Sequence, residues 1–181
     1  INKKKLMDQC IQLAEHNRKE GSSFMEFGVY RGESINYMAE QSDIKIYGFD
    51  SFEGLPKDWR IGYEKGKFSM NGTLPRVKEN VKLIKGLFSD SLEVLKKDEL
   101  DPIFIHVDCD LYESSMDIFY GLESCLSKGC ILLFDEFYNY PGWRQGEYKA
   151  WNEFSLANGI EYKYIGYVPN SEQVALVIES R

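Results

Sequence analysis

Four acidic residues in two short clusters are the residues of this chain best suited to chemistry. Asp108 and Asp110 lie in the segment FIHVDCDLYES, and Asp135 and Glu136 lie in CILLFDEF. Each cluster directly follows an apolar run that is typical of a buried strand. Because a carboxylate is rarely buried without a partner or a metal ion, two such clusters at the ends of neighbouring strands predict a site for a hard divalent cation.

The first cluster leaves two assignments open. If the strand continues, Asp108 and Asp110 point to the same face of the sheet, ~6.6 Å apart along the strand. Asp108 is favoured as the direct ligand because it stands at the strand end. The other carboxylate would orient a water, accept a proton or cap the next helix. His106 would point to the same face but lies deeper, so we expect a hydrogen-bonded core histidine there rather than a ligand.

A second group of residues predicts a nucleoside site. Gly28 follows an expected strand and Gly32 opens the next helix, so the backbone can turn tightly and approach a ligand. Asp50 follows Gly28 by about 20 residues, at a strand end where a carboxylate can accept hydrogen bonds from ribose hydroxyls. After the third strand, Phe88 is placed to lie against a flat base and Ser89 to meet its polar edge.

The elements that must position these residues alternate along the chain. Helices are expected over 2–19, 34–40, 75–80, 89–97 (with Ser89 or Asp90 as its cap), 116–126 and 147–157, and strands over 23–27, 44–49, 81–85, 103–107, 130–134, 162–167 and 173–179. This alternation is typical of a doubly wound α/β fold, and the short turn before the last strand requires an antiparallel pair. We expect one domain over 1–181, with a seven-stranded, mostly parallel sheet ending in an antiparallel hairpin.

Composition excludes several classes of function. The chain has 181 residues, 43% of them hydrophobic, and a formal net charge of −7. An acidic chain gives no electrostatic support for binding nucleic acid or an anionic membrane, and the run Lys3-Lys4-Lys5 is expected to be a solvated helix face. No stretch approaches ~18 consecutive apolar residues and no signal peptide is visible. We therefore expect a cytoplasmic protein whose four cysteines are reduced.

Five segments, in order, resemble the macrocin O-methyltransferase family: MEFGVYRGES, YGFDSFEGLP, VKLIKGLFSDSL, HVDCDLYES and LLFDEFYNYPGW. The resemblance covers residues 24–178. It implies the Rossmann-like class I methyltransferase fold and S-adenosylmethionine as the methyl donor. The residues that it implies for the donor are Glu26, Gly28, Arg31, Gly32, Ser34, Asp50, Ser51, Phe88, Ser89 and Asp108.

The same resemblance implies a magnesium ion, or another divalent cation, at the acidic clusters. The carboxylates that it implies as ligands are Asp108, Asp110, Asp135 and Glu136. Where the family usually has Asp-Asp, this chain has Asp-Glu, so Glu136 either ligates the ion or lies behind its ligands. The ion would lower the pKa of an acceptor hydroxyl, and Asp108 or Asp110 would take its proton during in-line methyl transfer. The implied acceptor is a small molecule, a sugar hydroxyl on a natural product or polysaccharide precursor.

Two segments are expected to complete the acceptor side. Aromatic residues crowd the chain after the fifth strand, and Tyr138, Tyr140 and Trp143 are expected in the acceptor pocket. The stretch 51–73 is too long for an idle connection and is expected to be a lid over donor and acceptor, with Trp59 and Tyr63 as its contacts. The resemblance also implies homo-oligomers that associate through the N-terminal helix, within the first 20 residues.

Two other functions fit part of the pattern. A nicotinamide-dependent oxidoreductase is disfavoured because Tyr30 replaces the middle glycine of the dinucleotide pattern. Glu26 would also repel phosphates, although it suits an ammonium-bearing ligand, and no Tyr-x-x-x-Lys pair follows the fourth strand. A non-catalytic nucleoside-binding module would need only Gly28 and Asp50, and it would leave the four carboxylates unexplained.

Overall fold

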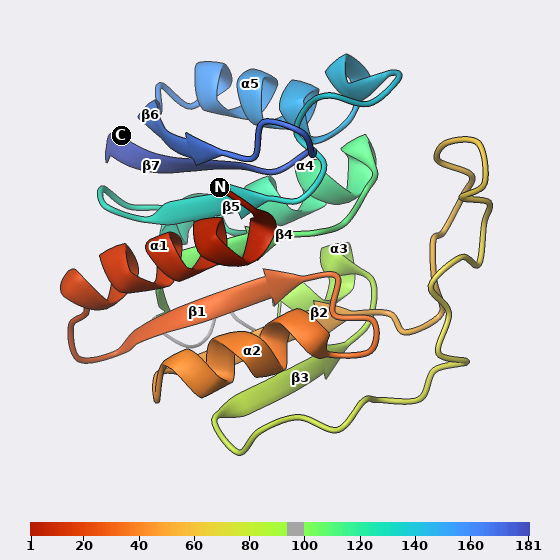
Figure 1. Cartoon of the computed structure of the whole chain (residues 1–181), viewed down its shortest axis with the longest axis horizontal. Helices are drawn as coiled ribbons and strands as arrows, with labels where there is room; N and C mark the ends of the chain where they lie inside the picture. Colours follow the sequence, from red (N-terminus) through yellow and green to blue (C-terminus); the bar gives the residue numbers. More distant parts are fainter. Residues whose placement is uncertain (94–99) are drawn as a thin grey trace.

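The strands of the chain form one sheet in the middle of the computed structural model, which describes residues 1–93 and 100–181 (Figure 1). The strands are β1 (Ser22–Phe27), β2 (Lys45–Asp50), β3 (Val81–Lys85), β4 (Asp101–Val107), β5 (Ile131–Phe134), β6 (Glu161–Tyr167) and β7 (Val174–Ser180). They lie in the order β3-β2-β1-β4-β5-β7-β6. β7 is antiparallel to β5 and β6, and the other neighbouring pairs are parallel. The expected seven-stranded fold with a final antiparallel hairpin is confirmed.

Helices cover both faces of the sheet (Figure 1). One face carries α1 (Lys3–His16) and α2 (Glu33–Gln41), and the other carries α3 (Phe88–Ser91), α4 (Tyr112–Gly121) and α5 (Glu147–Ala157). Two short 3-10 helices, η2 (Glu123–Cys125) and η3 (Trp143–Gln145), follow α4 and precede α5. Parallel strands covered on both faces are buried, and β1, β4 and β5 are buried along almost their whole length, including the polar residues Glu26 and His106.

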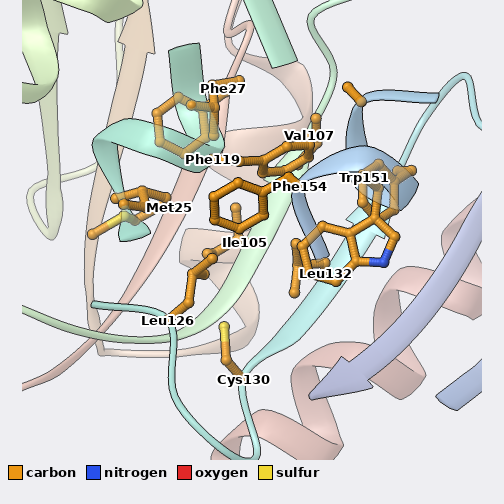
Figure 2. Packing of buried hydrophobic residues seen from close by; sticks show 14 of the residues in the cluster. Met25, Phe27, Ile105, Val107, Phe119, Leu126, Cys130, Leu132, Trp151 and Phe154 are labelled. Carbon is orange, nitrogen blue, oxygen red and sulfur yellow. The ribbon is translucent and has the colours of Figure 1, made fainter. Parts of the chain in front are cut away.

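The larger core lies between the sheet and helices α4 and α5. Phe119 of α4 packs edge-on against Trp151 of α5, with ring centroids 5.2 Å apart, and Figure 2 shows both rings in one cluster with Ile105 of β4. The neighbouring Phe104 belongs instead to the core under α1 and α2. Because strand side chains alternate between faces, His106 points to the same face as Phe104.

The order in which strands are added reverses beside β1. The chain proceeds from β1 to β2 and β3 on one side, and then forms β4 on the other side of β1. Backbone hydrogen bonds continue past the strand ends, because Asp108 N donates to Phe27 O and Asp135 N donates to Val107 O, both at 2.9 Å. The residues after β1, β4 and β5 therefore share one edge of the sheet, at the kind of reversal where open α/β sheets bind ligands.

Three of the expected helices differ from the structure. Residues 75–80 form no helix, because the side chain of Asn36 bonds their backbone: its Nδ2 donates to Arg76 O and its Oδ1 accepts from Lys78 N. A segment held in this way cannot form its own helical hydrogen bonds. The helix expected over 116–126 begins earlier, as α4, and its end is the separate turn η2.

The short helix after β3 also begins elsewhere. α3 starts at Phe88 with Leu87 as its N-cap, and not with Ser89 or Asp90 as the cap. The later part of the helix expected over 89–97, from residue 94, lies outside the described residues.

Two expectations from composition can be compared with the structure. The four cysteines all lie in the described part of the chain and are free thiols, as expected. Within residues 1–93 and 100–181, no helix combines the length and the apolar character that crossing a membrane requires.

Candidate functional site

A cavity of about 590 Å³ lies at the carboxyl ends of the parallel strands. Its described lining comes from the loops after β1 to β5 and from the segment 54–68, which projects beyond the strand ends in Figure 1 (yellow). Both groups of residues that the sequence singles out, around Asp50 and around Asp108, contribute to this one cavity. The residues expected at the nucleoside and those expected at the cation therefore meet in one cavity.

Gly28 and Asp50 build the turn on the nucleoside side. Asp50 Oδ2 accepts hydrogen bonds from Val29 N and Tyr30 N, each at 2.8 Å, so this carboxylate fixes the turn after β1. Gly28 has φ +93°, and a Cβ on it would lie 1.7 Å from the carbonyl oxygen of Asp108. Only glycine fits where the loop after β1 meets the loop after β4, so this residue sets the distance between the two halves of the site.

The residues expected at the donor separate into two groups. Gly28, Asp50, Ser51, Phe88 and Asp108 line the cavity. Its described lining does not include Glu26, Arg31, Gly32, Ser34 or Ser89.

The expected donor residues that do not line the cavity lie elsewhere in the fold. Gly32 is the left-handed N-cap of α2, with Ser34 in its first turn, and the Arg31 guanidinium lies over the Tyr30 ring. Ser89 is exposed beyond the cavity. Glu26 is fully buried, because its place in β1 turns it toward the face covered by α1. Strand parity, which Glu26 shares with Phe24, is the sequence signal that could have placed it there.

The four acidic residues converge as expected. Asp108, Asp110, Asp135 and Glu136 all line the cavity. Asp108 and Asp110 do not lie on one continuing strand, so the expected spacing along a strand is wrong. β4 ends at Val107, and Asp110 adopts a left-handed conformation with φ +65°. The chain turns at this point, and the turn rather than an extended strand brings the second carboxylate to the cavity.

Two basic side chains, those of His106 and Lys3, lie against these acidic residues. His106 Nδ1 lies 2.8 Å from Glu26 Oε1, and its Nε2 lies 3.8 Å from Asp135 Oδ1. Lys3 Nζ, from the start of α1, lies 2.6 Å from the same oxygen. His106 is therefore a hydrogen-bonded core histidine, as expected, whereas the expectation of a solvated face is wrong for Lys3. No local pattern could have revealed Lys3, because its contact depends on how α1 packs across β5.

The cavity shifts the proton affinities of these groups. Burial alone would lower the pKa of His106, but Asp135 and Glu26 raise it to about 10. Burial and then the charge of Asp135 raise the pKa of Asp110 to about 7. Burial alone would raise the pKa of Asp135. His106 and Lys3 lower it by more, so the pKa of Asp135 lies below its usual value. The pKa values of Asp110 and Asp135 are therefore shifted in opposite directions, although both residues line the same cavity.

The donor set fits a cation. His106, Asp108 and Asp135 each offer a ligand atom, and these atoms lie within 4.8 Å of one another. Glu136 Oε2 is buried and has no hydrogen-bond partner among the described residues, which is costly for a carboxylate oxygen without a cation. Oxygen-rich sets of this kind suit magnesium, and His106 already contributes its Nδ1 to Glu26.

The aromatic residues after β5 lie apart from the cavity, except through one contact. Trp59 lines the cavity, but its described lining excludes Tyr138, Tyr140 and Trp143. Tyr140 packs behind Trp59, with ring centroids 5.7 Å apart. The other two pack elsewhere: the Tyr138 hydroxyl donates to Val168 O, and Trp143 stacks edge-on with Tyr148. The segment after β5 folds back on the β6–β7 turn, and the 54–68 segment instead contributes Trp59, Tyr63 and Phe68 to the cavity lining.

The 54–68 segment is fastened across the cavity by Arg60, a residue that the sequence did not single out. Arg60 Nη1 donates to both carboxylate oxygens of Glu172, at 3.0 and 3.1 Å. Its guanidinium also lies 4.0 Å from the Trp59 ring centroid and 4.8 Å from those of Tyr63 and Tyr140. These contacts hold the segment against Glu172 and Tyr140 in this structure.

Comparisons with known proteins identify a family and a fold. The family model described as macrocin O-methyltransferase (TylF) matches residues 2–166. No curated protein sequence matches the chain significantly.

Three solved methyltransferases have a similar fold. The calicheamicin methyltransferase CalS11 is 20% identical, with a TM-score of 0.74 over 95% of this chain and 77% of that one. The O-methyltransferase NovP is 22% identical, with a TM-score of 0.68 over 98% and 79%. An O-methyltransferase from Bacillus cereus in complex with SAH is 16% identical, with a TM-score of 0.58 over 94% and 80%. At these identities the likeness shows the fold.

Proposed function

The chain belongs to the macrocin O-methyltransferase family and is an S-adenosylmethionine-dependent O-methyltransferase, and we propose that it methylates a sugar hydroxyl with the help of a divalent cation. The observation that carries this proposal is the shared cavity. Asp50 and Phe88 line one end of it, and the carboxylates of Asp108, Asp135 and Glu136 line the other. A methyl donor and an activated hydroxyl need this adjacency for in-line transfer.

The donor end would bind the nucleoside through few residues. Both oxygens of Asp50 accept backbone N–H groups, but a carboxylate has further lone pairs that can accept from ribose hydroxyls. Phe88 offers a face for the adenine, and Gly28 leaves the backbone open beside the sulfonium. Gly32, which we expected at the donor, would act indirectly by ending the turn and opening α2.

The cation end would hold the ion through Asp108 and Asp135, with Glu136 completing the set. When bound, a divalent ion lowers the pKa of an acceptor hydroxyl and fixes the direction of its oxygen. Asp110 is the residue that we assign as general base, because it lines the cavity beside the ligands and its carboxylate has no hydrogen bond to another described residue. It would take the hydroxyl proton as the methyl group is transferred.

The acceptor would lie under the 54–68 segment. Trp59 and Tyr63 offer aromatic faces, on which sugar rings stack, and both line the cavity. The apo structure of CalS11 is described as a TDP-rhamnose 3'-O-methyltransferase, which supports a sugar as the acceptor class. The role of the 51–73 stretch as a lid, the cytoplasmic location and the homo-oligomer stay predictions.

Calorimetric titration with S-adenosylhomocysteine tests the donor assignment, with NADH as the competing ligand. We expect heat of binding with S-adenosylhomocysteine and none with NADH, and the opposite result would overturn the proposal. A panel of free and nucleotide-linked sugars, incubated with S-adenosylmethionine and magnesium, tests the acceptor. Methylated product should appear with at least one sugar. When simple phenols are assayed in parallel, methylation confined to these phenols would contradict the sugar assignment.

A further inference from the structure

We propose that Glu147 is a positioning residue that holds the two acidic loops at the separation a divalent cation requires. The inference rests on the proposed function, since it concerns the same cation. Glu147 is the first residue of α5 and is 0% exposed. It does not line the cavity in the described part of the chain, so it would act through its neighbours and not by touching the substrate.

The carboxylate of Glu147 joins the two loops through its two oxygens. Oε1 accepts from Cys109 N at 3.4 Å, and Oε2 accepts from Glu136 N at 3.1 Å. Cys109 stands between Asp108 and Asp110 in the chain, and Glu136 directly follows Asp135. One buried side chain therefore fixes the backbone beside all four acidic residues of the cavity.

The position of Glu147 is itself constrained by packing. A Cβ on the preceding Gly146 would lie 2.5 Å from the Tyr140 hydroxyl and 3.7 Å from the carbonyl oxygen of Asp110. The start of α5 thus lies close to the Tyr140 hydroxyl and within packing distance of the loop after β4. The N-terminus of a helix also favours a negative charge, which opposes the burial and the nearby charges of Asp108 and Asp110 that raise the pKa of Glu147.

A structural role alone does not explain why this group is a carboxylate. Another negative charge beside four acids is unfavourable, and a buried charge must be paired or hydrogen-bonded to be tolerated. What a carboxylate offers here is two acceptor oxygens facing two N–H donors, since an amide has only one such oxygen. The arrangement is favourable when a cation in the cavity offsets the repulsion among the acids.

Glu147→Gln is the sharpest variant, because it keeps the volume and releases one of the two loops. We expect the calorimetric affinity for MgCl2 to fall by about tenfold or more, as when outer partners of metal ligands are removed. The affinity for S-adenosylhomocysteine, measured without magnesium, should stay unchanged. Glu153→Gln is the matched control, since Glu153 lies on the same helix with its side chain 48% exposed, and it should bind magnesium as the wild type does.

Glu147→Asp provides a second test where the Gln variant does not fold. It keeps the charge and both acceptor oxygens but is shorter by one methylene, so it cannot reach both loops, and its magnesium affinity should fall in the same direction. Folded variants that bind magnesium like the wild type, even with reduced thermal stability, would overturn the inference and leave the proposed function intact. A wild-type protein that binds no magnesium would overturn the cation and the inference together.

Discussion

The ammonium group of Lys3 lies 2.6 Å from Oδ1 of Asp135, so the first helix places a positive charge against the acidic cavity. The Lys3 side chain is 44% exposed and that of Asp135 10% exposed, so the contact is at the rim of the buried site. Asp135 is also one of the two residues that we assign as principal ligands of the cation. The same oxygen therefore has two candidate partners, an ammonium group and a metal ion.

Removal of the Lys3 charge should strengthen magnesium binding. In Lys3→Met the magnesium ion no longer competes with the ammonium group for Asp135, and no positive charge repels it. We therefore expect the affinity of the protein for magnesium to rise by about three- to tenfold. Calorimetry with MgCl2 measures the change. Lys5→Met is the control, because Lys5 is exposed on the same helix, and it should leave the affinity unchanged. Weaker binding by the Lys3 variant would show that Lys3 supports the ion instead.

Gly28→Ala should destabilise the fold strongly. The added Cβ would lie 1.7 Å from the Asp108 carbonyl oxygen, so β1 and β4 would have to separate at the site. Gly21→Ala is the matched control, since Gly21 has φ +85° with nothing within 4 Å of the added atom. Its cost should be the conformational penalty alone, about 1 kcal/mol, and the Gly28 variant should lose at least twice as much.

Urea unfolding of both variants measures these costs. Equal losses would contradict the close approach between the loops after β1 and β4.

The 54–68 segment should open when its ion pair is removed. Glu172→Ala deletes the acceptor of both Arg60 hydrogen bonds, and a partly buried ion pair contributes about 1 kcal/mol, so local opening should become about fivefold more frequent. Limited trypsin digestion, followed by mass spectrometry of cuts at Lys57, Lys65 and Lys67, measures this opening.

Glu179→Ala removes another ion pair, with Lys163 on β6, and it should not change the cutting rate in the segment. If the Glu172 variant is cut no faster than this control, Arg60 does not fasten the segment.

Much of the site could be predicted because strand order and register fix it. Apolar runs separated by helical segments define the parallel sheet, and the ends of parallel strands meet at one edge. Asp108 and Asp135 each donate a backbone hydrogen bond to the last residue of the adjacent strand. Their convergence therefore follows from local sequence and general sheet geometry.

Other parts depend on contacts between distant segments, which leave no local pattern. Lys3 and Glu147 both reach the site from helix starts, and their positions depend on how α1 and α5 pack on the sheet. The placement of Tyr138 and Trp143 away from the cavity depends on the segment folding back on the β6–β7 turn. Aromatic content shows that a segment is apolar, but not which side of it meets a ligand.

The dependence of methyl transfer on a divalent ion tests the central claim most directly. The protein is treated with EDTA, dialysed, and assayed with S-adenosylmethionine and a sugar that it accepts, before and after MgCl2 is returned. Lewis-acid activation of a hydroxyl contributes several kcal/mol, so we expect transfer to fall by about a hundredfold or more without the ion and to recover when magnesium is restored. An undiminished rate in the ion-free protein would contradict the cation's role.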